Sequence, residues 1–163
     1  MSALFAATYP ERTNALVLFG AFACRVWSEE YPFAPTRQER EVWIRSLERG
    51  WGHDNEVGHL APSRAHDPAF ARWFQRYGRA SVSPSAAVAL ARMNTEIDIR
   101  SILPSIRVPT LVIHRTEDLD VDVRNARYLA QAIPAARLVE LPAGTTWSSP
   151  ATWTPSQGRS RSS

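Results

Sequence analysis

The chain has 163 residues, 44% of them hydrophobic, which is enough to bury the core of one domain and excludes a wholly disordered protein. Its formal charge is +3, from 19 basic residues against 16 acidic ones. All the basic residues are arginines interleaved with acids, so no basic face for nucleic acid is predicted. The longest apolar run, Ala15 to Cys24, is too short to span a membrane, and the single cysteine excludes a disulfide framework.

The first predicted elements are a helix and a buried strand. Residues 2–8 are small and apolar and are typical of the end of a helix, which Tyr9-Pro10 stops. Ala15–Phe19 is a continuous apolar run ending at Gly20, and such a run predicts a strand of a parallel sheet that is covered on both faces.

The same run, extended to Cys24, loosely resembles the apolar part of a secretion signal ending at a cysteine. The preceding Tyr9-Pro10-Glu11-Arg12 contains a proline and an acid, unlike the basic start of such a signal, so a strand and loop are preferred. With no signal peptide, the predicted location is the cytoplasm.

Residues 25–95 are rich in tryptophan, arginine and glutamate and predict a helical insertion of about three short helices. The first spans Arg37–Arg49 and ends at Gly50. The second begins at Asp67-Pro68 and the third at Ser83-Pro84, where a capping side chain precedes a proline. The second helix carries one aromatic stripe: Phe70, Trp73, Phe74 and Tyr77. We expect the tryptophan and phenylalanine residues of 25–95 to pack mainly into the insertion's own core, with a substrate-facing lid as the alternative.

A strand, a helix and a strand follow, over Pro109–Arg115, Arg124–Ile133 and Arg137–Leu141. This order predicts a parallel βαβ unit. From residue 145 the chain has neither an acid nor any periodicity, so residues 145–163 are predicted to be a disordered tail.

Three segments, in this order, resemble the C-terminal half of an α/β-hydrolase. Residues 1–20 resemble the helix after the nucleophile elbow and the next strand. Residues 106–118 resemble the strand that delivers the acid of the catalytic triad, and residues 127–142 the helix and strand that lead to the triad histidine. The subgroup most similar occurs alone or joined to class III adenylate/guanylate cyclase domains, mainly in actinobacteria. The resemblance spans residues 1–144 and implies a partial α/β-hydrolase domain with a helical lid at about 25–95.

The resemblance implies chemistry by a serine in a G-x-S-x-G elbow, a histidine and an acid. Asp118 directly follows a buried strand, where the family's acid belongs, and is the candidate catalytic residue; Glu117 stands where the family usually has glycine. One alternative is a solvated acidic loop containing Asp120 and Asp122. Another is a calcium loop, although the required glycine and closing glutamate are missing.

Two parts of the family pattern are absent. The chain contains no G-x-S-x-G, so we interpret Met1 as an internal methionine of a longer protein. The family's Gly-x-Asp-His is replaced by residues 143–146, Ala-Gly-Thr-Thr. His114 lies inside a strand and is predicted to be a packed core residue. The other histidines are interpreted as surface or lid residues and not as a metal site: His53, His59 and His66. No cofactor or metal is predicted.

A frameshift near Gly144 would explain the missing histidine and the unusual tail. Codons can be chosen for Gly144 onward such that reading from the third base gives DDLVFAGDVDPIAGEVEE. That sequence resembles the family's own ending, a short apolar turn followed by an acidic amphipathic helix.

The predicted function is that of a truncated α/β-hydrolase, inactive alone, whose parent is a serine hydrolase acting on ester-like or other acyl substrates. The alternative is a non-catalytic module that senses a small ligand and regulates an adenylate/guanylate cyclase-type protein, with possible covalent fusion to the cyclase. A third possibility is a product without function. The predicted partner is a small-molecule substrate or ligand of the parent protein, with neither nucleic acid nor membrane.

Overall fold

The computed structural model describes residues 1–51 and 57–142. The predictions about the tail, residues 145–163, therefore fall outside the described residues, as do His53 and the side chain of His59.

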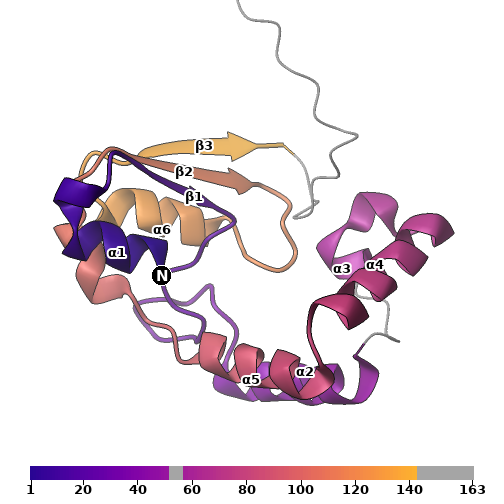
Figure 1. Cartoon of the computed structure of the whole chain (residues 1–163). Coiled ribbons are helices and arrows are strands. Elements are labelled where there is room, and N and C mark those ends of the chain that lie inside the picture. Colours follow the sequence, from indigo (N-terminus) through magenta and orange to yellow (C-terminus); the bar gives the residue numbers. More distant parts are fainter. Residues whose placement is uncertain (52–56, 143–163) are drawn as a thin grey trace, which may run out of the picture.

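Three parallel strands form the centre of the structure (Figure 1). They are β1 (Leu16–Phe19), β2 (Thr110–Arg115) and β3 (Arg137–Leu141), in the order β1-β2-β3. Leu18 lies opposite Val112, which in turn lies opposite Leu138. The predicted α/β class and the βαβ unit are therefore confirmed, and β3 has the bounds expected from the sequence.

One face of the sheet is covered by α1 (Ser2–Thr8) and α6 (Arg124–Ala132), which lie on the same side in Figure 1. Two 3₁₀ helices, η1 (Pro10–Arg12) and η3 (Arg100–Ser105), complete this layer. Alternate strand residues point into it, because successive side chains of a strand face opposite ways. The core it encloses includes the fully buried Leu103, Ile106, Val112, Leu129 and Ile133.

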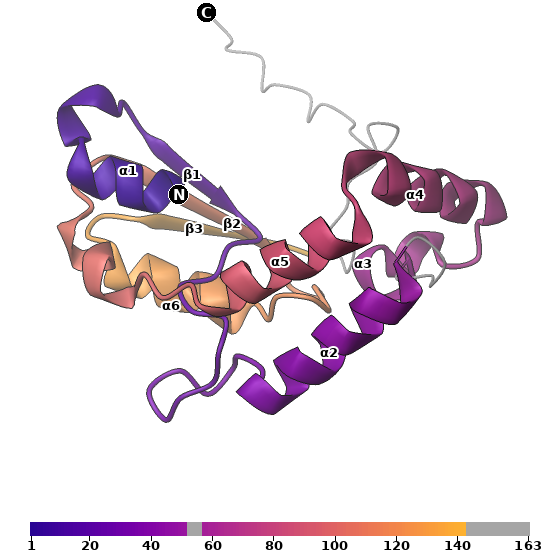
Figure 2. The same ribbon diagram turned by 60° about the horizontal axis from the view of Figure 1, so that its bottom comes forward.

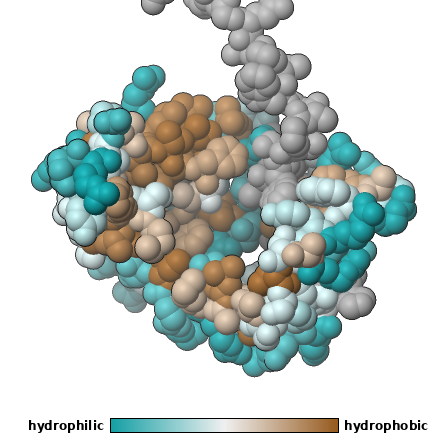
Figure 3. All heavy atoms as spheres, viewed as in Figure 1, coloured by the Kyte–Doolittle hydropathy of each residue, from teal (hydrophilic) through white to brown (hydrophobic). Residues whose placement is uncertain are grey.

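The opposite face of the sheet is open over the described residues. Val17 is 59% exposed, Phe19 46% and Val139 37%, and hydrophobic side chains gather over the sheet in Figure 3. The prediction that Ala15–Phe19 is covered on both faces is therefore wrong for the described part of the chain. The outer edge of β1 likewise pairs with no strand among these residues.

A helical segment connects β1 to β2 and extends to one side of the sheet (Figure 2). Its elements are α2 (Arg37–Gly50), α3 (Val57–Leu60), η2 (Pro62–Arg64), α4 (Pro68–Ser81) and α5 (Pro84–Thr95). The predicted starts are confirmed: Asp67 accepts the amides of Ala69 and Phe70, and Ser83 accepts the amide of Ala86. We shall call α2–α5 the helical segment.

The helical segment has a small core between α2 and α5, made of Ile44, Leu47, Ala87 and Ala91. The aromatic stripe of α4 does not join it, because no residue of α4 is buried. Its rings contact one another along the helix instead, with Trp73 and Tyr77 stacked at 5.5 Å. The predicted inward packing is thus confirmed for Trp43 and Trp51, which pack against this core, and is not found for the stripe of α4 among the described residues.

Candidate active site

The candidate site lies where the three parallel strands end. Ligand sites of open α/β sheets occur at the carboxyl ends of the strands, since the connecting loops converge there. β1 leads into Gly20, whose φ of +55° is a left-handed conformation that favours glycine. At the neighbouring strand ends, the Thr116 amide donates to Leu141 O (3.0 Å), which joins the end of β2 to the end of β3.

Asp118 is held in a fixed position at this edge. The residue is 9% exposed, and its own amide donates to Arg115 O (3.2 Å), which turns the chain sharply after β2. Oδ1 accepts the amides of Asp120 (2.9 Å) and Val121 (3.0 Å). Oδ2 has no partner among the described residues, so one carboxylate oxygen is fixed and the other remains able to accept a hydrogen bond.

His114 supports the loop that carries Asp118. It is fully buried, as expected of a packed core residue, and its Nε2 lies 2.7 Å from Val121 O. A carbonyl oxygen only accepts, so Nε2 carries a proton and donates it to Val121 O. Nδ1 is enclosed and has no hydrogen-bond partner among the described residues. The ring is therefore not the base of a triad with Asp118; it fixes Val121, whose amide binds Asp118.

Asp120 and Asp122 each have an arginine partner. Asp120 Oδ1 accepts from Arg25 Nη2 at 2.7 Å, so the loop after β1 is tied to the loop after β2. Asp122 accepts from Arg124 Nη2 at 2.8 Å, and this hydrogen bond holds the pKa of Asp122 below its usual value. The three carboxylates thus have separate partners, and no group able to hold a metal ion occurs among the described residues.

A buried tyrosine positions the loop after β1. Tyr31 is fully enclosed; its hydroxyl donates to Asn125 Oδ1 at the start of α6 and accepts the amide of Ala23 (3.1 Å). Burial raises the pKa of Tyr31 to about 12, so the hydroxyl stays protonated and remains a donor at neutral pH. The anchor fixes Arg25, two residues beyond Ala23, against Asp120.

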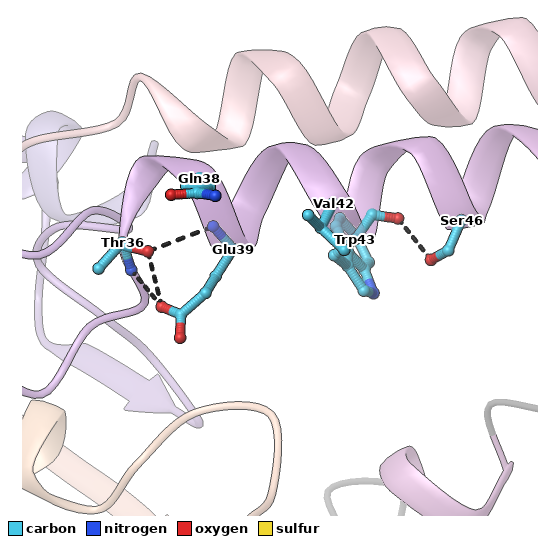
Figure 4. Close-up of a pocket in the computed structure, with 6 residues that line it drawn as sticks. All are labelled: Thr36, Gln38, Glu39, Val42, Trp43 and Ser46. Atoms are coloured by element: carbon cyan, nitrogen blue, oxygen red, sulfur yellow. Dashed lines mark hydrogen bonds between the residues drawn. The ribbon is translucent and has the colours of Figure 1, made fainter.

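The helical segment carries a shallow hollow of about 580 Å³ on α2, lined by Thr36, Gln38, Glu39, Val42, Trp43 and Ser46. Figure 4 shows these side chains along the side of α2 that is turned away from α5. The polar groups at one end are already bonded to each other: Thr36 and Glu39 form a reciprocal cap of α2. The other end offers Val42 and Trp43, so the hollow is a mainly apolar surface.

Comparison of the structure with solved proteins finds a consistent set of neighbours. A bromoperoxidase from Bacillus anthracis is 20% identical with a TM-score of 0.74, over 88% of this chain and 55% of its own. An esterase from Exiguobacterium antarcticum is 22% identical with a TM-score of 0.66, over 85% of this chain and 54% of its own. The enol-lactonase from Burkholderia xenovorans LB400 is 26% identical with a TM-score of 0.66, over 89% of this chain and 54% of its own.

This chain has the C-terminal part of an α/β-hydrolase fold. It spans about half the length of the solved structures it matches. No family model and no curated protein matches its sequence. Asp118 follows the end of β2 at Arg115, and its role as the triad acid stays a prediction.

Sequence reasoning did not find the roles of Arg25 and His114. Arg25 is 95 positions from the aspartate it binds, which no local pattern reveals.

His66 is exposed in the helical segment. Among the described residues, no helix is long and apolar enough to cross a membrane.

Proposed function

We propose that this chain is the C-terminal part of a serine hydrolase acting on ester-like or other acyl substrates, with Asp118 as the acid of its triad. The observation that carries the proposal is the geometry of Asp118 at the carboxyl edge of the sheet. Two backbone amides fix Oδ1, and Oδ2 remains available to a histidine. An acid that orients an imidazole needs this combination of a rigid carboxylate and one accepting oxygen.

In the proposed reaction a serine Oγ forms a bond to the acyl carbon while its proton passes to the histidine. Asp118 Oδ2 accepts the other N–H of that ring, keeps it in the correct tautomer and stabilises the imidazolium. The oxyanion then collapses, the bond to the leaving group breaks, and the histidine returns the proton to that group. Water then attacks the acyl carbon while the histidine takes a proton from the water. The bond to the serine Oγ breaks, and the histidine returns the proton to that oxygen.

The handedness of the fold supports a position for the serine. Connections between parallel strands are right-handed, and α1 and α6 lie on the same face of the sheet (Figure 1). β3 lies on the side of β2 that faces away from β1. A strand preceding α1 would therefore pair with the free edge of β1, at the other end of the sheet from β3. A strand-to-helix elbow would then lie directly before α1, at the edge that holds Asp118. We therefore propose that the parent protein supplies the serine and this chain supplies the acid.

Several finer features belong to the same proposal. The 163-residue chain is inactive alone, because the G-x-S-x-G elbow and the Gly-x-Asp-His segment are missing from it. The parent acts in the cytoplasm on a small molecule, free or joined to a class III cyclase domain, with the helical segment as its lid. A frameshift near Gly144 accounts for the missing histidine. The second candidate is a non-catalytic ligand-sensing module of a cyclase-type protein, which the mainly apolar hollow on α2 favours.

The decisive experiment restores the missing parts. An N-terminal hydrolase half with a G-x-S-x-G elbow is fused before residues 2–142, followed by a segment bearing the histidine, and turnover of p-nitrophenyl esters is measured. Asp118→Asn should lower kcat by roughly 10⁴-fold, because the imidazole is left in the wrong tautomer. The matched control is Glu117→Gln, an exposed neighbouring carboxylate, which should stay within about twofold of the fusion.

The outcomes separate the two candidate functions. Full activity in Asp118→Asn would show that Asp118 is not the acid. A fusion that folds, binds acyl ligands and never turns them over would support the sensing module. For the unfused chain we expect no turnover above background, and turnover abolished by a serine-directed inhibitor would contradict this.

A further inference from the structure

The helix α4 carries a strongly charged surface that the proposed hydrolysis does not use. Its 14 residues include three arginines, Arg72, Arg76 and Arg79, and no acid. All three are exposed, and they lie four and three positions apart, which places them on one face of the helix. Figures 1 and 2 both show α4 on the side of the molecule away from the sheet.

Two of these arginines are not neutralised by any described residue. In the other long helices arginines have carboxylate partners: Arg92 of α5 pairs with Glu41 (3.3 Å), and Arg127 of α6 pairs with Glu140 (2.7 Å). Arg72 and Arg76 form no ion pair with another described residue. Like charges four positions apart on a helix destabilise it, so α4 retains a repulsion that a negatively charged partner would relieve.

The three arginines line one hollow on the surface. It has a volume of about 340 Å³, and its other lining residues are Ala69 and Gln75. A second hollow, of about 450 Å³, shares Arg72 and Gln75 with the first and extends to the start of α4, where it is lined by Ala65, His66, Pro68 and Ala71. No described acid lines either hollow, so an anionic group that approaches the arginines meets no carboxylate there.

Aromatic rings lie beside this basic face. Trp73 directly follows Arg72, and Tyr77 directly follows Arg76, so each ring is turned by about 100° around the helix from its arginine. Phe70, Trp73 and Tyr77 contact one another in a row, with ring centres 5.5 Å apart at each step. Trp73 is nevertheless 41% exposed and Tyr77 46%. The surface of α4 therefore combines positive charge with exposed aromatic rings.

This combination is typical of a helix that lies on a charged lipid surface. Such helices carry arginine on one face and large apolar or aromatic residues on another, and they lie in the plane of the membrane. The rings of tryptophan and tyrosine have an apolar body and a polar end, which suits the boundary between lipid and water. Long arginine stems let the charge remain among the headgroups. A soluble acidic partner would engage the arginines alone, whereas an anionic membrane engages both the arginines and the rings.

We propose that α4 docks the protein on the surface of an anionic phospholipid membrane. Arg72, Arg76 and Arg79 contact the lipid phosphates, and Trp73 and Tyr77 enter the headgroup layer. The expectation of no membrane partner came from a sequence without a segment long enough to span a bilayer, and a helix lying on the surface needs no such segment. The docking is independent of the proposed hydrolysis, because it uses no residue of the candidate active site.

Vesicles test the proposal on the full 163-residue chain. Cosedimentation at low ionic strength compares vesicles of phosphatidylcholine alone with vesicles that contain equal amounts of phosphatidylcholine and phosphatidylglycerol. Each arginine at an anionic surface strengthens binding about fivefold, so we expect roughly 100-fold tighter binding to the mixed vesicles. Equal binding to the two kinds of vesicle, or binding to neither, would overturn the proposal.

Matched charge removals show whether α4 is the docking surface. The double variant Arg72→Gln/Arg76→Gln should bind the mixed vesicles about 25-fold more weakly. Arg45→Gln/Arg49→Gln removes the same charge from exposed positions of α2 and should weaken binding by less than about threefold. All four residues are exposed, so both variants should stay folded, which circular dichroism checks. Equal losses in the two variants would mean general charge attraction and would contradict docking through α4.

The aromatic rings distinguish a lipid surface from a soluble acidic partner. On binding mixed vesicles, the tryptophan fluorescence should shift to shorter wavelength, and Trp73→Phe should lose most of that shift. Trp73→Ala should weaken binding to the mixed vesicles and leave binding to soluble poly-glutamate unchanged. If poly-glutamate binds as tightly as the mixed vesicles and Trp73→Ala changes neither, the surface binds acidic chains and the lipid proposal is wrong.

Discussion

Around the sheet, fifteen apolar side chains of the described residues form one buried cluster, whereas the cluster in the described part of the helical segment has four, with Val57 and Ala61 buried outside it. The helical segment depends more on polar contacts, such as the reciprocal cap of Thr36 and Glu39 and the exposed Arg37–Glu96 pair (2.6 Å). Exposed ion pairs stabilise little, so we expect the helical segment to open before the sheet layer does. The proposed chemistry thus lies on the region expected to be more stable, and the mainly apolar hollow on α2 lies on the other.

The largest effect should come from the sheet layer. Leu129 is fully buried in α6 against the sheet, and Leu129→Ala should lower the free energy of unfolding by about 3 kcal/mol, through lost burial and the cavity left behind. Urea denaturation measures this. Leu119→Ala is the control, because Leu119 is 56% exposed, and should change stability by less than about 0.5 kcal/mol. A similar cost for both would mean that the sheet layer is not the stable region.

The strands, and the helices built on local signals, could be predicted from the sequence. β3 was expected at Arg137–Leu141 and is found there, and the starts of α4 and α5 follow from Asp67 and Ser83, whose side chains cap their own helices. The exposure of Val17 could not be predicted, because a run of apolar residues does not reveal what covers each face of a strand.

The candidate site, like the fold, could be predicted from the sequence only in part. Asp118 could be singled out from the strand before it, and its role as the acid stays a prediction. The His114–Val121 bond and the Arg25–Asp120 pair could not, because each depends on how the loops fold back over the sheet edge. The bonds from Arg40 to Ala91 O and Thr95 Oγ1 could not be predicted either, because they join α2 to a different helix.

A substitution of intermediate effect tests whether the helical segment unfolds separately from the sheet layer. Ile44 is fully buried between α2 and α5, and Ile44→Ala should lower local stability by about 2 kcal/mol, near the lower end for such truncations because few neighbours pack there. Amide hydrogen exchange should speed up in α2 and α5 while β2 keeps its protection. Equal loss of protection in β2 would show that the two regions unfold as one unit.

The smallest effect concerns the charge at the start of α4. Asp67 Oδ1 accepts the amides of Ala69 and Phe70 (3.0 Å each), and the Phe70 bond in particular holds the pKa of Asp67 below its usual value. Because folding lowers this pKa, the stabilisation is fully present above the ordinary aspartate value, near 3.9, and is lost as the pH falls through the lower folded value. In NMR, the amide shifts of Ala69 and Phe70 should titrate with a midpoint below about 3.9. Asp67→Asn keeps an accepting oxygen at the cap and removes the charge, so α4 should persist while this titration disappears. The other acids still titrate in that variant, and a midpoint that survives in Asp67→Asn would therefore assign the cap's pH dependence to another carboxylate.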